Sequence, residues 1–186
     1  MNATDVVGAL VRGAPEALFV ASLGTATSAL RSATDDGPHL YLGGSMGSAL
    51  AVAIGVAEKQ PDRDVVAVLG DGEALMGAGS FWTLASVRST RLVVAVLCDG
   101  RYSITGGQAL GSPANFAAVA RALGLAAATV ETEDEVVAAL EGSERPDLLE
   151  IQYSEQAWPG PSAFVDPPVV RWRFERAAAG EPADGS

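Results

Sequence analysis

Short runs of strand-forming apolar residues recur along the chain, separated by alanine-rich stretches with helical spacing. The runs lie at 17–22, 64–70, 91–98, 126–130 and 147–153, and helices are expected at 45–60, 113–123 and 132–140. Strands that are apolar on both sides are typical of a parallel sheet that helices cover on both faces. The alternation predicts an α/β fold, a doubly wound and mostly parallel sheet whose ligands bind at the carboxyl ends of the strands.

The domain organisation follows from length and from a shift in composition. A chain of 186 residues fits one domain with a sizeable core. From residue 158 on, the sequence is rich in proline and loses apolar periodicity. We expect one domain over residues 1–157 and an irregular tail over 158–186, with the last dozen residues disordered. The aromatic residues of the tail are expected to pack on the domain or on a partner: Trp158, Phe164, Trp172 and Phe174.

The charge balance argues against several classes of partner. The formal net charge is −11, from 23 acidic and 12 basic residues. Such a chain repels phosphate backbones and anionic membrane surfaces, and no apolar run approaches the roughly 18 residues of a membrane span. The single cysteine, Cys98, has no partner for an internal disulfide, which suits a reducing compartment. We expect a cytoplasmic protein that binds neither nucleic acid nor membrane.

Three glycine-rich segments stand where strands are expected to end, at 43–47, 70–79 and 99–108. Glycine lets backbone N–H groups approach a ligand, and a following helix N-terminus favours an anion such as a diphosphate. None of the segments has the G-x-G-x-x-G spacing of a dinucleotide site, and the G-K-[S/T] of a P-loop does not occur. The pattern indicates a phosphate-bearing ligand of another kind.

Two aspartates follow neighbouring predicted strands. Asp71 stands between two glycines after the strand at 64–70, and Asp99 ends the strand at 91–98. Mg²⁺ prefers carboxylate and carbonyl oxygens and often bridges a protein to diphosphate oxygens. The two carboxylates with a main-chain carbonyl just beyond Asp99 would suit it. Asp-Gly after a strand is also ordinary turn chemistry, so a tight turn without a metal remains an alternative on spacing alone.

The G-D-G at 70–72, with a polar residue and glycine one strand later, resembles the thiamine diphosphate motif of the 2-keto acid decarboxylase superfamily. That motif ends in an Asn-Asn pair where this chain has Cys98-Asp99. The stretch 42–85 and the G-G-Q at 106–108 are similar to the β-subunits or C-terminal halves of phosphonopyruvate and sulfopyruvate decarboxylases. The resemblance covers about residues 5–153. It implies the diphosphate-binding domain of a thiamine diphosphate- and Mg²⁺-dependent decarboxylase.

The resemblance also implies roles for individual residues. Asp71 and Asp99 would ligate Mg²⁺ by their side chains and Arg101 by its main-chain carbonyl. Met46 would prop the bound cofactor into a bent conformation, although a core methionine is the alternative by residue type. The residues expected to contact the cofactor are Gly44, Ser45, Met46, Gly70, Asp71, Gly72, Glu73, Asp99 and Arg101. Gly72 and Glu73 would lie along the diphosphate.

The chain departs from the family pattern near this site. Asp99 replaces an asparagine and Glu73 a small residue, so cofactor affinity is expected to depend more steeply on Mg²⁺. Three residues are candidates for contact with the substrate or for catalysis: His39, Arg101 and Tyr102. The Arg101 guanidinium suits a substrate carboxylate or second anion, with a solvated loop arginine as the alternative. A lone histidine such as His39 is more often structural.

Members of this superfamily have a second, pyrimidine-binding domain that supplies a glutamate to the cofactor. The resemblance implies that this glutamate comes from a separate α-subunit, in an α₂β₂ or larger assembly. It also implies the reaction, in which a 2-keto acid loses CO₂ and an aldehyde is released. Two alternatives remain open: a subunit of a carboligase similar to acetolactate synthase, and a non-catalytic subunit that binds the cofactor or serves as a scaffold.

Overall fold

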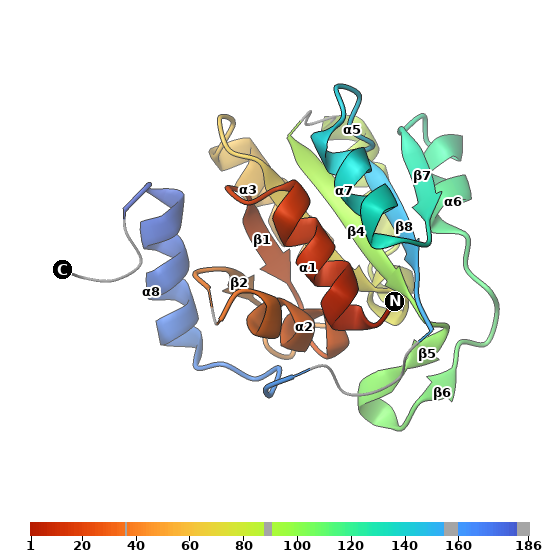
Figure 1. Cartoon of the computed structure of the whole chain (residues 1–186), viewed down its shortest axis with the longest axis horizontal. Helices are drawn as coiled ribbons and strands as arrows, with labels where there is room; N and C mark the ends of the chain where they lie inside the picture. The colour runs from red at the N-terminus through yellow and green to blue at the C-terminus, as the bar shows by residue number, and fades with distance from the viewer. Residues whose placement is uncertain (36, 88–90, 155–159, 182–186) are drawn as a thin grey trace.

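A computed structural model describes residues 1–35, 37–87, 91–154 and 160–181. Within these ranges the chain forms a six-stranded, fully parallel sheet in the order β2-β1-β3-β4-β8-β7 (Figure 1). The strands are β1 (Leu18–Ala21), β2 (Leu40–Tyr41), β3 (Val65–Gly70), β4 (Leu92–Cys98), β7 (Ala127–Val130) and β8 (Leu148–Gln152). The predicted parallel α/β fold is confirmed, and each of the predicted strands is present.

The central strands β3 and β4 bring the two aspartates to one edge of the sheet. They consist mainly of valine, leucine and alanine, side chains that pack well between two layers of helices, and nearly all of both strands is buried. Gly70 pairs with Leu97 in the parallel register. Because the two strands end together, the residues that follow them, Asp71 and Asp99, lie at the same edge.

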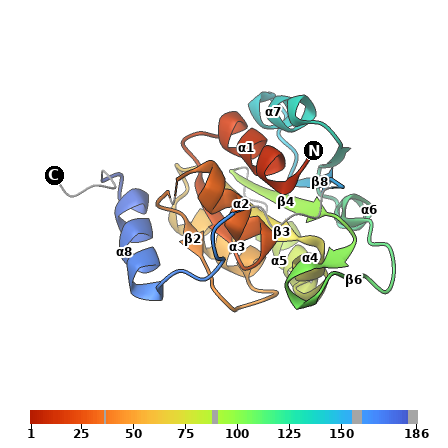
Figure 2. The ribbon, with the colours of Figure 1, turned by 60° about the horizontal axis from the view of Figure 1, so that its bottom comes forward.

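Helices cover both faces of the sheet (Figures 1 and 2). One apolar core lies beneath α1 (Ala3–Gly13), α2 (Thr25–Ala33) and α7 (Glu133–Glu141). A second core lies beneath α3 (Ala49–Lys59), α4 (Asp71–Met76), α5 (Gly79–Val87) and α6 (Phe116–Ala122). In the described ranges, none of the helices is long and apolar enough to cross a membrane.

The starts of two helices differ from the sequence-based expectation. The helix expected over 45–60 begins at Ala49, because the preceding G-S-M-G forms a loop in which Gly47 has a φ of +87°. The helix expected from Pro113 begins at Phe116, because the Asn115 side chain accepts a hydrogen bond from the Ala118 N–H and caps it. The predicted capping box before α7 is present, between Thr132 and Glu135.

The C-terminal segment corrects the prediction of an irregular tail. Residues Pro167–Ala178 form a helix, α8. Its two leading prolines occupy the first turn, where a missing N–H costs nothing, and Val170 and Phe174 lie one turn apart and are both buried. The expected disorder of the last dozen residues is therefore wrong as far as Ala178. The predicted boundary at residue 157 and the last five residues lie outside the described residues.

Helix α8 lies beside β2, the edge strand of the sheet (Figure 1). The Ser28 hydroxyl donates to the Pro161 carbonyl at 2.7 Å, and the Arg63 guanidinium donates to the Ala177 carbonyl at 3.0 Å. Covering an edge strand in this way protects it from pairing with other chains. Of the aromatic residues predicted to pack, Phe174 is buried whereas Phe164 and Trp172 are largely exposed, and Trp158 lies outside the described residues.

Candidate cofactor site

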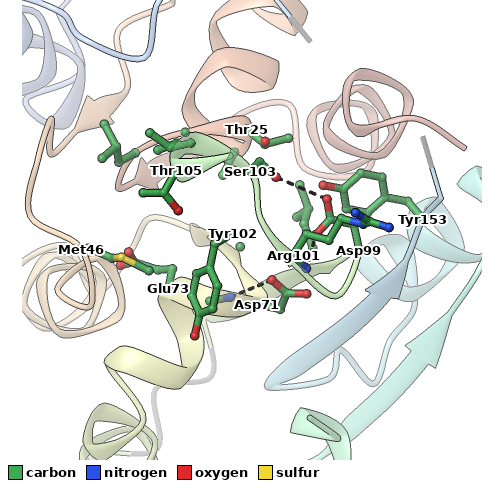
Figure 3. Close-up of a pocket in the computed structure, with 17 residues that line it drawn as sticks. Thr25, Met46, Asp71, Glu73, Asp99, Arg101, Tyr102, Ser103, Thr105 and Tyr153 are labelled. Carbon is green, nitrogen blue, oxygen red and sulfur yellow. Dashed lines mark hydrogen bonds between the residues drawn. The ribbon is translucent and has the colours of Figure 1, made fainter. Parts of the chain in front are cut away.

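An open cleft lies at the carboxyl ends of β1, β3, β4 and β8 (Figure 3). Small-molecule and cofactor sites are typically concave clefts of this kind. The chain passes from β1 to β2 on one side and then to β3 on the other, so the cleft is at the topological switch point, where such folds bind ligands. Its lining comprises Leu23, Gly24, Thr25, Ala26, Met46, Gly70, Asp71, Gly72, Glu73, Leu97, Asp99, Arg101, Tyr102, Ser103, Ile104, Thr105 and Tyr153.

The N-terminus of α2 faces the cleft, which the sequence analysis did not foresee. Residues Leu23–Ala26 line it, and the cap residue Gly24 has a φ of +72° and makes no side-chain hydrogen bond to the helix. The first N–H groups of a helix attract anions. The sequence signal that points to this helix end is Gly24, two residues after the predicted strand at 17–22. The N–H groups at this helix end are suited to bind oxygens of a diphosphate.

The carboxylates of Asp71 and Asp99 are held by backbone and hydroxyl donors. Asp71 is 3% exposed, and its two oxygens accept hydrogen bonds from the N–H groups of Gly72 and Gly100, each at 2.7 Å. Asp99 accepts from the Arg101 N–H at 3.0 Å and from the Ser103 hydroxyl at 3.4 Å. Burial, and then the charge of Asp99, raise the pKa of Asp71, while its N–H partners oppose the rise.

The donor set fits Mg²⁺ only if further oxygens join it. Within the described ranges, no group of three or more His, Cys, Asp and Glu side chains is placed to hold a metal ion. The carbonyls of Gly100 and Tyr102 accept hydrogen bonds from the N–H groups of Leu110 and Gly107. Because successive residues of an extended strand alternate in direction, the Arg101 carbonyl between them points to the other side of the strand. Two carboxylates, this carbonyl and diphosphate oxygens would complete an octahedral set.

Met46 lies at the mouth of the cleft rather than in the core. It is 39% exposed and lines the cavity, so the alternative of a core methionine does not hold. Its methyl group and the Tyr102 ring flank Gly72: a Cβ added at Gly72 would be 2.5 Å from the ring and 3.5 Å from the Met46 Cε. A side chain at position 72 would therefore have to displace the Tyr102 ring. Gly44 and Ser45, also predicted to contact the cofactor, are exposed beside Met46 but do not line the cleft.

The roof of the cleft is the hairpin formed by β5 (Arg101–Tyr102) and β6 (Gln108–Ala109), joined through a short 3₁₀ helix (Ser103–Thr105). The Arg101 guanidinium is exposed and donates to the Gly107 carbonyl at 3.2 Å. No sequence motif points to Tyr153, which lines the cleft directly after β8. Burial, and then the charge of Asp99 and a hydrogen bond to it, raise the pKa of Tyr153.

Two further candidate residues, Glu73 and His39, differ in their relation to the cleft. Glu73 lines the cleft, but both its carboxylate oxygens accept buried hydrogen bonds from the protein. His39 does not line the cleft at all. Its ring makes edge-to-face contacts with Phe19 and Tyr41, at centroid distances of 5.0 and 6.4 Å. His39 therefore belongs to the packing around β2.

The partly buried His39 gives a prediction for the pH dependence of stability. Burial lowers the pKa of His39 from 6.5 to about 4. Between these values the unfolded chain binds a proton that the folded chain excludes, so stability falls as the pH drops from 6.5 towards 4, by about 3 kcal/mol in total. His39→Phe should keep the ring contacts and flatten this dependence, measured by urea unfolding at several pH values. An equal slope in both proteins would contradict the assignment.

Comparison with known proteins agrees with this geometry. Residues 22–150 match the family described as thiamine pyrophosphate enzyme, C-terminal TPP binding domain. The chain is 36% identical to phosphonopyruvate decarboxylase of Streptomyces hygroscopicus over 162 residues, 84% of this chain but only 39% of that protein. It is 25% identical to sulfopyruvate decarboxylase subunit beta of Methanocaldococcus jannaschii over 182 residues, 93% of this chain and 95% of that subunit.

A solved structure shows the same fold. The thiamine diphosphate-dependent 4-hydroxybenzoylformate decarboxylase of Rhodococcus jostii RHA1 superposes with a TM-score of 0.67 at 22% identity, over 84% of this chain and 33% of that one. The family match covers well over half of the chain, and all the residues that line the cleft except Tyr153 lie within it. The chain belongs to the thiamine pyrophosphate enzymes, in which it represents the C-terminal, cofactor-binding domain.

Proposed function

We propose that this chain is the diphosphate-binding (β) subunit of a two-subunit, thiamine diphosphate-dependent decarboxylase. Its substrate would be a 2-keto acid similar to phosphonopyruvate or sulfopyruvate, and its products CO₂ and an aldehyde. The observation that carries the proposal is the cleft at the switch point. There the N-terminus of α2 and the paired carboxylates of Asp71 and Asp99 surround a space suited to a metal-bound diphosphate.

Each part of the cleft has a role in this proposal. Asp71, Asp99 and the Arg101 carbonyl would hold Mg²⁺, and the N–H groups at the start of α2 would bind diphosphate oxygens. Met46 would support the organic part of the cofactor, and the hairpin 101–109 would keep water from the reacting centre. When bound, thiamine diphosphate supplies the electron sink that a 2-keto acid needs in order to lose CO₂.

The partner in this proposal is a separate α-subunit that carries the pyrimidine-binding domain and its glutamate, in an α₂β₂ or larger assembly. The support is the near full-length match to a relative whose name is sulfopyruvate decarboxylase subunit beta. A cytoplasmic location is part of the same proposal. A carboligase is the second candidate, since the chain is also 37% identical over 106 residues to a putative acetolactate synthase large subunit of Mycobacterium tuberculosis.

The test is calorimetric titration of thiamine diphosphate with Mg²⁺ into this chain co-purified with the product of a neighbouring gene, and into the chain alone. We expect binding to the complex, followed by CO₂ release from a 2-keto acid. Product analysis with and without an acceptor aldehyde separates decarboxylation from ligation. If neither sample binds the cofactor, the enzyme proposal fails and a scaffold subunit remains.

Arg101→Ala tests the proposed contact with the substrate anion. The exposed guanidinium on the hairpin donates one of its N–H groups to the Gly107 carbonyl, which leaves other donors for a ligand. We expect the KM for the accepted keto acid to rise about 10-fold, in line with the loss of a charged hydrogen bond, with little change in kcat. Arg121→Ala, on the exposed surface of α6, is the control. An unchanged KM for every accepted keto acid would exclude the contact.

A further inference from the structure

Glu73 has a buried carboxylate that lies between segments from three parts of the chain. The residue is 8% exposed. Its Oε2 accepts a hydrogen bond from the Ser22 hydroxyl at 2.7 Å, and its Oε1 accepts one from the Ala49 N–H at 3.2 Å. Both hydrogen bonds are buried, where such bonds are strong and a lost partner is costly.

The two donors belong to the other segments that form the cleft. Ser22 directly follows β1 and directly precedes the lining residues Leu23–Ala26, whereas Ala49 begins α3, three residues after Met46. Glu73 itself lies in the first turn of α4, two residues after Asp71. One carboxylate therefore connects the anion-facing end of α2, the loop that carries Met46, and the G-D-G turn.

Helix α3 depends on this carboxylate for a cap. Its own cap residue, Ser48, makes no side-chain hydrogen bond to the helix, and its hydroxyl bonds to the Ser45 carbonyl instead. The Glu73 carboxylate takes the place of a cap side chain and puts a negative charge at a helix N-terminus, where it is stabilising. The orientation of α3, and with it the preceding loop, is coupled to α4.

A role for Glu73 as a ligand of the diphosphate is unfavourable for two reasons. Its oxygens are already engaged, and a third carboxylate beside Asp71 and Asp99 would repel an anion. We propose that Glu73 is a positioning residue that holds the β1–α2 segment and the Met46 loop in register with the G-D-G turn through its bonds to Ser22 and Ala49. The proposal rests on the proposed function for the identity of the ligand, thiamine diphosphate, but the positioning itself concerns this chain alone.

The first test is hydrogen–deuterium exchange on the chain without ligand. Glu73→Ala removes both bonds, so amides of 22–26 and of 45–49 should exchange about 10-fold faster or more. Glu73→Gln can keep both contacts, since its carbonyl oxygen accepts from Ala49 and its NH₂ group can donate to the Ser22 hydroxyl. It should stay close to the unaltered chain. Unchanged exchange in Glu73→Ala would overturn the proposal whether or not the chain binds a cofactor.

The second test is calorimetric binding of thiamine diphosphate and Mg²⁺ to the complex with the partner. Glu73→Ala should raise the Kd about 10-fold or more and Glu73→Gln by less than about threefold. Ser22→Ala as a single change should raise the Kd. Combined with Glu73→Ala it should add little, since Ser22 and Glu73 act through one shared hydrogen bond. Val136→Ala, a core truncation in α7, controls for lost stability and should leave the Kd unchanged.

The outcomes separate the two proposals. Binding by the unaltered complex with an equal Kd in Glu73→Ala would refute the positioning role and leave the proposed function standing. If Glu73→Gln raised the Kd as much as Glu73→Ala while its amides of 22–26 and 45–49 exchanged as in the unaltered chain, the negative charge rather than the positioning of these segments would set the affinity, which also refutes it. Failure of the unaltered complex to bind cofactor would refute the proposed function, and the exchange experiment would still decide the positioning role.

Discussion

Replacing Asp71 by alanine is expected to weaken Mg²⁺-dependent binding of thiamine diphosphate by about 100-fold or more, beyond the loss typical for outer-shell partners of a metal. Asp71 is nearly fully buried at the end of β3, and its carboxylate faces the cleft beside Asp99. The variant removes a proposed metal ligand and also leaves the N–H groups of Gly72 and Gly100 without their acceptor. Both effects lower affinity, the second by loosening the turn and the roof hairpin.

Two further variants separate these effects. Asp71→Asn keeps an oxygen for one of the two N–H groups but removes the charge, so it should fold normally and still bind poorly. Asp62→Ala makes the same change in net charge at an exposed turn before β3 and should bind as the unaltered chain does. The measurement is titration of the cofactor at several Mg²⁺ concentrations with the partner present. Binding by Asp71→Ala at the original Mg²⁺ dependence would overturn the metal assignment.

The pairing of Asp71 with Asp99 was predictable because it depends on local patterns alone. Two apolar runs identify adjacent strands, and parallel strands of matched register end at one edge. The resemblance to a known motif placed Met46 and Arg101 near the same edge, and both line the cleft. These features depend on strand register and on a short motif, which can be read from a sequence.

The remaining parts of the site depend on contacts between distant segments. Ser22 and Glu73 meet because β1 and β3 are neighbours in the sheet, although β2 lies between them in the chain. Tyr153 reaches Asp99 from the end of β8 for the same reason. No spacing rule gives these pairs. His39 is the converse case. It is close to G-G-S-M-G in sequence, but its ring packs against Phe19 and lies outside the cleft.

The C-terminal segment shows that a proline-rich composition is compatible with a helix. The proline content predicts irregular structure over 158–186, yet two adjacent prolines start α8. What decides the matter is the pair of buried side chains one turn apart, Val170 and Phe174, which fit against the sheet. A window of one apolar pair is too short to predict a helix from periodicity, so only tertiary packing reveals it.

Gly77→Ala is expected to disturb the support of Met46 through the backbone. A Cβ at Gly77 would lie 2.4 Å from the Gly47 carbonyl oxygen and 3.0 Å from its carbonyl carbon. These are backbone atoms, so the G-S-M-G loop must move away from the end of α4. We expect a loss of about 1–3 kcal/mol in the free energy of unfolding, typical of overpacking. Because the displaced loop carries Met46, cofactor affinity should fall with it.

Gly79→Ala is the matched control, because it adds the same methyl group two residues later. A Cβ at Gly79, the first residue of α5, meets no atom within 4 Å. Alanine is the better helix former by about 1 kcal/mol, so this variant should be as stable as the unaltered chain or more so. Urea unfolding and cofactor titration of both variants decide the point. If Gly77→Ala matched Gly79→Ala in both measurements, the close approach of the Met46 loop to α4 would be irrelevant to the site. A loss of stability and of cofactor affinity confined to Gly77→Ala would show that this backbone contact sets the position of Met46.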